Sequence, residues 1–143
     1  MHACELRGQR RAFKSISLRG TTAGQRAELV RSARREILNL RRLSHSNIVQ
    51  LVGAVMDVED SVGLILELAP HGSLRKLLDS KPAEVVGIQP VQLRLAAGIA
   101  AGMAFLHALP PPRGPLLHHD LKSANVLLFN SDLGPVPKLA DFG

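Results

Sequence analysis

The sequence predicts an α+β fold, in which a small sheet with one helix precedes a mostly helical part that closes on a β-hairpin. Strand-like stretches at residues 5–17 and 48–68, with a helix-period stripe between them, predict the first part. An unbroken apolar or glycine run at residues 95–106 predicts a buried helix in the second, because it is too short to span a bilayer. With 143 residues and 45% hydrophobic content, the chain can bury one core.

Composition and charge narrow the classes of function. The single cysteine, Cys4, excludes a disulfide framework and a Cys-based zinc site, and no signal-peptide pattern opens the chain, so we expect a reducing, cytoplasmic setting. The net charge of +6 is concentrated at residues 1–42, where eleven Lys/Arg face three Glu. A basic arm could bind nucleic acid or an anionic membrane. No aromatic residue is interleaved to stack on bases, so we favour a solvated helix face and no nucleic-acid partner.

An ion pair is predicted between the first strands and the first helix. Residues 5–17 have the pattern of two strands joined at Gly8-Gln9, and Lys14 lies on the second. Residues 24–43 place apolar side chains every three or four positions, which indicates a helix with one buried stripe, and Glu36 falls inside that stripe. A carboxylate against a core is costly unless a cation meets it, so we predict a Lys14–Glu36 pair. The alternative is a Glu36 side chain that reaches solvent at the edge of the stripe.

Turn and helix signals organise the middle of the chain. Residues 48–58 and 61–68 predict a hairpin with an acidic turn, and Ser73 is placed to cap a short helix. A long helix is predicted at residues 90–108, where Gly98 and Gly102 allow close packing. The proline-rich stretch at 110–115 contains a P-x-x-P pattern, which is weak evidence for an SH3-type ligand, so we favour a surface insertion.

A group of polar residues near the end of the chain has the residue types of a phosphoryl-transfer site. Asp120, Lys122 and Asn125 precede an apolar run at 126–129, and Asp141 follows a second run at 138–140. The two runs predict a hairpin that brings Asn125 opposite Asp141. Phosphoryl transfer requires a base, a cation and hard oxygen ligands aimed at one point. The alternative is a solvated polar loop before a buried strand.

These motifs resemble the catalytic domain of protein kinases. H-x-D-L-K-S-A-N-V-L-L and G-M-x-F-L-H are most similar to the tyrosine-kinase-like group of Ser/Thr kinases, and the resemblance runs from about residue 5 to residue 143. It implies transfer of the γ-phosphoryl group of Mg-ATP to a Ser/Thr hydroxyl of a protein substrate, with Asp120 as catalytic base and Lys122 against the γ-phosphate. Asn125 and Asp141 would hold Mg²⁺. Lys14, paired with Glu36, would meet the α- and β-phosphates.

The same resemblance divides the chain and assigns the adenine contacts. It implies an incomplete kinase domain over residues 1–143, with an N-lobe portion at about 5–68, a hinge at 66–72 and a C-lobe portion at 73–143. The residues that it places around the adenine, including a gatekeeper and two hinge backbones, are Ala12, Leu66, Glu67, Ala69 and Leu127. The residues that it assigns to a stacked hydrophobic spine are Leu40, Leu51, His118 and Phe142.

Three departures from the kinase pattern shape the expected activity. The chain has no G-x-G-x-x-G, nothing follows Gly143, and His119 stands where the family has Arg. We therefore expect a fragment of a kinase domain that is inactive alone. Two alternatives stay open: a non-catalytic, pseudokinase-like binding module, and a small-molecule phosphotransferase. The patterns D-L-K at 120–122 and D-F-G at 141–143 argue against the second. The sequence leaves the peptide substrate and the oligomeric state open.

Overall fold

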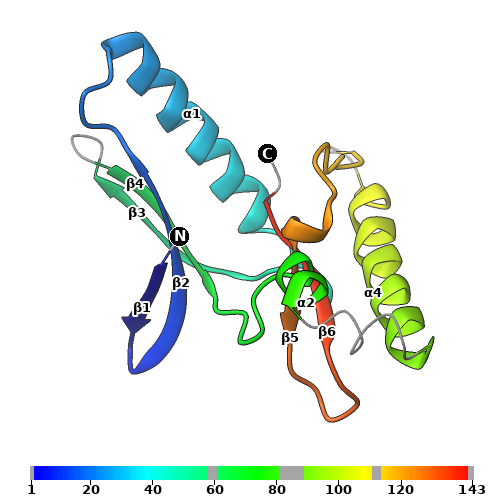
Figure 1. Cartoon of the computed structure of the whole chain (residues 1–143). Helices are drawn as coiled ribbons and strands as arrows, with labels where there is room; N and C mark the ends of the chain where they lie inside the picture. The colour runs from blue at the N-terminus through cyan, green and yellow to red at the C-terminus, as the bar shows by residue number, and fades with distance from the viewer. Residues whose placement is uncertain (1, 58–60, 81–88, 111–113, 142–143) are drawn as a thin grey trace. The chain divides into compact units, whose positions relative to one another are not determined.

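The computed structural model describes residues 2–57, 61–80, 89–110 and 114–141 (Figure 1). The chain forms two compact units, one made of Met1–Leu43 and Gln50–Leu68, the other of Ser44–Val49 and Ala69–Gly143. The fold class predicted from the sequence is confirmed: an antiparallel sheet with one helix comes first, and a mostly helical part with a β-hairpin follows.

The first unit contains a four-stranded antiparallel sheet. Its strands are β1 (His2–Leu6), β2 (Gln9–Ser17), β3 (Leu51–Asp57) and β4 (Ser61–Glu67), in the order β1-β2-β4-β3. The turn between β1 and β2 lies at Arg7 and Gly8, one residue earlier than predicted, and both residues have positive φ (53° and 74°). A two-residue turn with both φ values positive matches the twist of the flanking strands, which fixes the register of the hairpin.

Helix α1 (Ala23–Leu40) packs its predicted apolar stripe against this sheet. Thr22 and Gln25 form a reciprocal capping box that sets its start, and Leu18, Ala33 and Val62 form the centre of the buried cluster. The helix ends three residues before the predicted Leu43. Leu43 is nevertheless buried, because a tighter turn in which its N–H donates to the Leu40 carbonyl carries it back to the core.

Strand β3 begins at Leu51, whereas the sequence pattern predicted a strand from residue 48. The segment before it pairs elsewhere: Ile48 forms an isolated parallel bridge with Leu139, and the Val49 N–H donates to the Leu139 carbonyl at 2.9 Å. Residues 44–49 therefore belong to the second unit, although apolar periodicity continues from them into β3.

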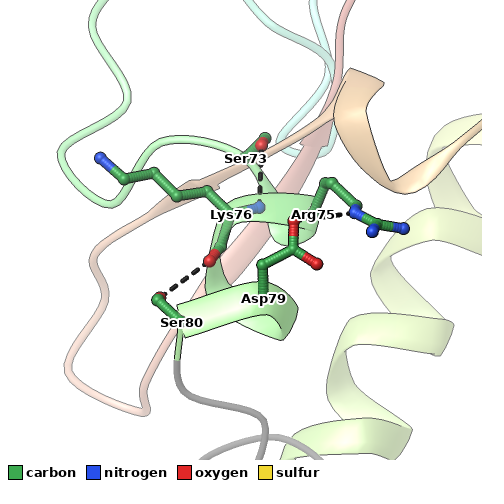
Figure 2. Close-up of polar contacts among 5 residues, drawn as sticks. All are labelled: Ser73, Arg75, Lys76, Asp79 and Ser80. Carbon is green, nitrogen blue, oxygen red and sulfur yellow. Dashed lines mark hydrogen bonds and ion pairs between the residues drawn. The ribbon is translucent and has the colours of Figure 1, made fainter.

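The second unit contains two helices, α2 (Leu74–Ser80) and α4 (Gln89–His107), and the hairpin of β5 (Val126–Phe129) and β6 (Val136–Leu139). The predicted hairpin forms, but its second strand is Val136–Leu139 where 138–140 was expected. Figure 2 shows the first turn of α2, in which Ser73 Oγ accepts from the Lys76 N–H at 3.2 Å, so the predicted N-cap is confirmed. An Arg75–Asp79 pair at 2.9 Å braces the same helix.

The predicted close packing at Gly98 and Gly102 is confirmed, and the structure shows that the partner of α4 there is β6. A Cβ added at Gly98 would lie 2.6 Å from Pro137 Cγ, and one at Gly102 would lie 2.9 Å from the Asn47 carbonyl oxygen. Among the described residues α4 buries only Leu95, Gly102 and Leu106, so most of an apolar run that would suit the interior of a lobe is exposed or half-buried in this chain. Within the described ranges, no helix has the length and apolar character needed to cross a bilayer.

Several sequence predictions fall outside the described residues. They are the acidic turn at 58–60, the centre of the proline-rich stretch at 111–113, and Phe142 and Gly143 of D-F-G.

Candidate active site

The first unit holds the predicted ion pair. Lys14 lies on β2 and Glu36 on the facing side of α1, and Lys14 Nζ is 2.9 Å from Glu36 Oε1. The side chains are 27% and 12% exposed, so the pair is partly withdrawn from water. The strand period of two places Ala12 on the same side of β2 as Lys14, and Ala12 is buried. The pairing predicted from the sequence is confirmed.

In the second unit, three of the predicted residues converge on one carboxylate oxygen. Lys122 Nζ is 2.7 Å from Asp120 Oδ2, and Asn125 Nδ2 donates to the same oxygen at 3.0 Å and to the Asp120 carbonyl at 2.9 Å. Among the described residues, no hydrogen bond uses Asp120 Oδ1. The carboxylate is therefore held by one oxygen while the other is open to a substrate group.

The pKa of Asp120 is lowered from its ordinary value by this arrangement. The hydrogen bond from Lys122 is the largest cause, and the charge of Lys122, the Asn125 amide and the charge of His118 act in the same direction, while burial opposes them. Asp120 is thus ionised at neutral pH, which is the form that accepts a proton.

A local backbone reversal presents Asp120 at the surface. His119 has a φ of 59°, and the Asp120 N–H donates to the His118 carbonyl at 2.8 Å. His118 is buried and its two neighbours along the chain are exposed. The reversal therefore keeps the His118 side chain in the interior and brings the Asp120 side chain to the surface. His119, at the position where the family has Arg, has the left-handed conformation that few residues other than glycine adopt.

The hairpin fixes Asn125 opposite the residue that precedes Asp141. The Ala140 N–H donates to the Asn125 carbonyl at 2.9 Å, continuing the ladder that pairs Val126 with Leu139. Asn125 therefore lies opposite Ala140, one residue from the predicted partner Asp141. Asp141 itself has a φ of 59°, which turns the chain directly after β6.

One residue that supports this site was not singled out from the sequence. Asn47 Nδ2 donates to the Pro137 carbonyl at 2.8 Å, and the Asn47 carbonyl accepts from the Leu139 N–H at 2.9 Å. These bonds hold β6 along the edge that is not paired with β5, just before Asp141. The available sequence signal was a polar Asn47 directly before the apolar pair Ile48-Val49.

The residues expected around the adenine are distributed over both units. Ala12 and Leu66 are buried neighbours in the β2–β4 ladder, and Glu67 follows them. The N–H of Glu67, on one of the two hinge backbones expected to contact the adenine, donates to the Gln50 carbonyl at 3.1 Å, so that donor is not available to a ligand. The other two, Ala69 and Leu127, lie in the second unit, where the Ala69 carbonyl accepts from Gly72.

Asn125 and Asp141 have the donor atoms that a magnesium ion requires. Both hydrogen bonds of the Asn125 side chain use Nδ2, which leaves Oδ1 as a hard oxygen ligand. No cluster of three or more His, Cys, Asp or Glu with metal-site geometry occurs in the described part of the chain. Mg²⁺ does not need one, because in phosphoryl-transfer sites it is bound by one or two carboxylates together with substrate phosphates and water.

Comparisons with known proteins show the family to which the chain belongs. The family model described as "Protein kinase domain" matches residues 2–143. The chain is 37% identical over 137 residues to the serine/threonine-protein kinase PBS1 of Arabidopsis thaliana, which covers 95% of this chain and 27% of that protein. It is 36% identical over 140 residues to the Arabidopsis serine/threonine-protein kinase PBL27, covering 97% and 25%. It is also 38% identical over 112 residues to the probable serine/threonine-protein kinase pats1 of Dictyostelium discoideum, covering 77% and 3%. The chain therefore spans about a quarter or less of each of these relatives.

Proposed function

Because this chain belongs to the protein kinase domain family, we propose that it is part of an ATP-dependent Ser/Thr protein kinase, which transfers the γ-phosphoryl group of Mg-ATP to a protein hydroxyl. The observation that carries the proposal is the Asp120 carboxylate, held through Oδ2 by Lys122 at 2.7 Å and Asn125 at 3.0 Å. This arrangement supports orientation of a hydroxyl by the open oxygen. The single cysteine supports a reducing, cytoplasmic setting for the activity.

Each residue around Asp120 has a distinct task in this proposal. Asp120 would orient the substrate hydroxyl through Oδ1 and accept its proton as the hydroxyl oxygen bonds to the γ-phosphorus and the bond from that phosphorus to the β–γ bridging oxygen breaks, releasing ADP. Lys122 keeps Asp120 ionised and supplies positive charge for the γ-phosphate oxygens. Asn125 Oδ1 and the Asp141 carboxylate hold Mg²⁺, which together with ATP supplies the phosphoryl group and the neutralising charge when bound.

The residues assigned to the nucleotide in this proposal come from both units. Lys14 meets the α- and β-phosphates, and Glu36 holds it in place through the 2.9 Å pair. Ala12 and Leu127 enclose the adenine ring, with Leu66 as gatekeeper. The carbonyl of Glu67 and the backbone of Ala69 face the edge of the ring. In this proposal the N-lobe portion covers about residues 5–68, the hinge covers 66–72 and the C-lobe portion covers 73–143.

Nucleotide binding by the chain tests the first half of the proposal. We expect a fluorescent ATP analogue to bind in a magnesium-dependent manner. Lys14→Ala and Asp141→Asn should weaken binding, because each removes a charge that faces the phosphates or the metal ion. Lys76→Ala and Asp132→Asn are matched controls, since both side chains are exposed and lie outside the proposed site. Equal binding by all four variants would contradict the assignments.

Phosphoryl transfer tests the second half. We would replace the matching segment of PBS1 with residues 2–143 of this chain and measure phosphate transfer to a generic protein substrate. Asp120→Asn should lower turnover by about 100-fold or more, the scale of general base catalysis, and leave nucleotide binding unchanged. A hybrid that binds Mg-ATP but has no turnover above the Asp120→Asn variant would favour the alternative, a non-catalytic binding module.

A further inference from the structure

One serine outside the proposed active site follows closely on a pair of arginines. The run Arg41-Arg42-Leu43-Ser44 places arginine two and three residues before the Ser44 hydroxyl. No other serine or threonine in the sequence has arginine at both of these positions. Charge patterns around the acceptor hydroxyl are one means by which protein kinases select substrates, and a guanidinium pair suits an enzyme with carboxylates beside its cleft. A short pattern alone is weak evidence, so the surroundings of the hydroxyl are decisive.

The Ser44 hydroxyl is accessible. Ser44 is exposed and lies outside the helices and strands, shortly after the end of α1. Among the residues that the structure describes, no hydrogen bond involves its side chain. The neighbouring Ser46 is also exposed, but its Oγ donates to Asn47 Oδ1 at 3.3 Å. Of these two serines, only Ser44 therefore combines the arginine pair with a hydroxyl that no bond orients.

The arginine pair is presented to solvent as well. Arg41 and Arg42 are both exposed, and no carboxylate in the described ranges lies within ion-pair distance of either. The two acidic residues of α1 are engaged elsewhere, Glu28 with Arg31 at 3.1 Å and Glu36 in its pair on the sheet. Both guanidinium groups can therefore form charge-assisted hydrogen bonds with the carboxylates of another protein.

The residue between the arginines and the serine controls access to this run. Leu43 is only 3% exposed, and its N–H donates to the Leu40 carbonyl at 3.1 Å. The N–H groups of Arg41 and Arg42 also donate back to the last turn of α1. An enzyme that contacts the arginines and the hydroxyl along one cleft must draw this turn open first. The opening involves one turn at the end of a helix, where local unfolding costs least.

We propose that Ser44 is a phosphorylation site for a separate protein kinase that recognises the Arg41-Arg42 pair. In this step Ser44 Oγ bonds to the γ-phosphorus of ATP, and the bond from that phosphorus to the β–γ bridging oxygen breaks. ADP leaves, and the hydroxyl proton passes to the base of the modifying kinase. The phosphate adds a charge of about −1.5 to −2 directly after residues 31–42, which carry five arginines and one glutamate. The proposal is independent of the chain's own activity, because the chain is here the substrate.

The test incubates the 143-residue chain with Mg-ATP and a purified Ser/Thr kinase that requires arginine two and three residues before the modified serine. The chain carries Asp120→Asn, so that its own proposed activity cannot contribute. Tandem mass spectrometry should find phosphate on Ser44 and none on Ser46. A kinase that requires acidic residues after the serine is the reference enzyme, and it should leave Ser44 unmodified.

Variants of the chain show what the kinase recognises. Arg41→Ala and Arg42→Ala should each slow phosphorylation by about 10-fold or more, the scale of one hydrogen-bonded charge. Arg34→Ala and Arg35→Ala remove the same charge earlier on α1 and are the matched controls, with an unchanged rate expected. Leu43→Ala should raise the rate several-fold, because it loosens the turn that must open. Circular dichroism would show that each variant keeps its helices, and Leu43→Val is the milder change if the alanine variant does not.

Three results would overturn the proposal. Phosphorylation of a synthetic peptide of residues 38–48, with none of the folded chain, would mean that the fold withholds Ser44. An equal loss of rate in Arg34→Ala would assign the effect to net charge and not to the spacing of the arginine pair. Equal phosphate on Ser46, or modification of Ser44 by the reference enzyme, would mean that exposure alone selects the hydroxyl.

Discussion

Replacement of Gly102 by alanine tests the packing that holds the strand before Asp141. An added Cβ would lie 2.9 Å from the Asn47 carbonyl oxygen and 3.0 Å from Leu139 Cδ1. The carbonyl cannot move away cheaply, because it accepts the 2.9 Å hydrogen bond from the Leu139 N–H. Helix α4 must therefore shift outward, or the Asn47–Leu139 bond must lengthen.

The expected size of the effect follows from two opposing contributions. Alanine in place of glycine inside a helix stabilises by about 1 kcal/mol. Forcing a methyl group into a packed contact costs about 1–3 kcal/mol, and the rigid backbone partner at Asn47 favours the middle of that range. We therefore expect Gly102→Ala to lower the free energy of unfolding by about 1 kcal/mol, whereas helix propensity alone would raise it by about the same amount.

Urea unfolding followed by far-ultraviolet circular dichroism measures the change, because the chain has no Trp or Tyr to report by fluorescence. Ala101→Gly, at an exposed position of the same helix, calibrates the propensity contribution. Hydrogen exchange gives a local readout: the amides of Leu139 and Val49 should exchange faster in Gly102→Ala. Stabilisation by Gly102→Ala, with unchanged protection of those two amides, would refute the close packing of α4 on β6.

Three further outcomes are expected. Lys122→Met should raise the pKa of Asp120 toward its ordinary value of 3.8, as measured by ¹³C NMR of the carboxyl carbon. Because that pKa is lowered in the folded chain, the stabilising interaction is present above pH 3.8 and lost as pH falls below it, and the variant should lack this acid dependence. Ser73→Ala should destabilise α2 by about 1 kcal/mol through loss of the N-cap, seen as faster amide exchange in its first turn, and unchanged exchange would contradict the cap. A double-mutant cycle of Lys14→Met and Glu36→Gln should give a coupling free energy of about 1–2 kcal/mol, between exposed and buried pairs, and a value near zero would mean that the pair is incidental.

Local sequence patterns were sufficient where the signal is contained within one element or one turn. Glu36 could be paired with Lys14 because a carboxylate inside an apolar helical stripe needs a cation, and Lys14 lies on the strand that precedes the helix. The Ser73 cap and the close packing at Gly98 and Gly102 were predictable for the same reason. Each depends on the chemistry of one or two side chains at a fixed position in a helix.

Strand pairing was decided by tertiary structure. Residues 48–50 carry the same apolar pattern as β3, and periodicity gives no information about which neighbour receives their hydrogen bonds. In the folded chain Asn47 and Val49 bond to Leu139, so strand β3 begins only at Leu51. The partner strand is distant in sequence, and its choice depends on how well α4 and β6 fit around Asn47.

The sequence by itself determined which chemical groups gather near the end of the chain, because Asp120, Lys122 and Asn125 lie within six residues and can meet through a single turn. Tertiary structure decided their geometry. It placed Asn125 opposite Ala140, and it required a positive φ at His119 to expose Asp120 while His118 is buried. It also brought Ile37 of α1 and Ala54 of β3, which are far apart along the chain, to line the same hollows. A hollow depends on how two elements pack against each other, and the sequence pattern of each element does not specify that packing.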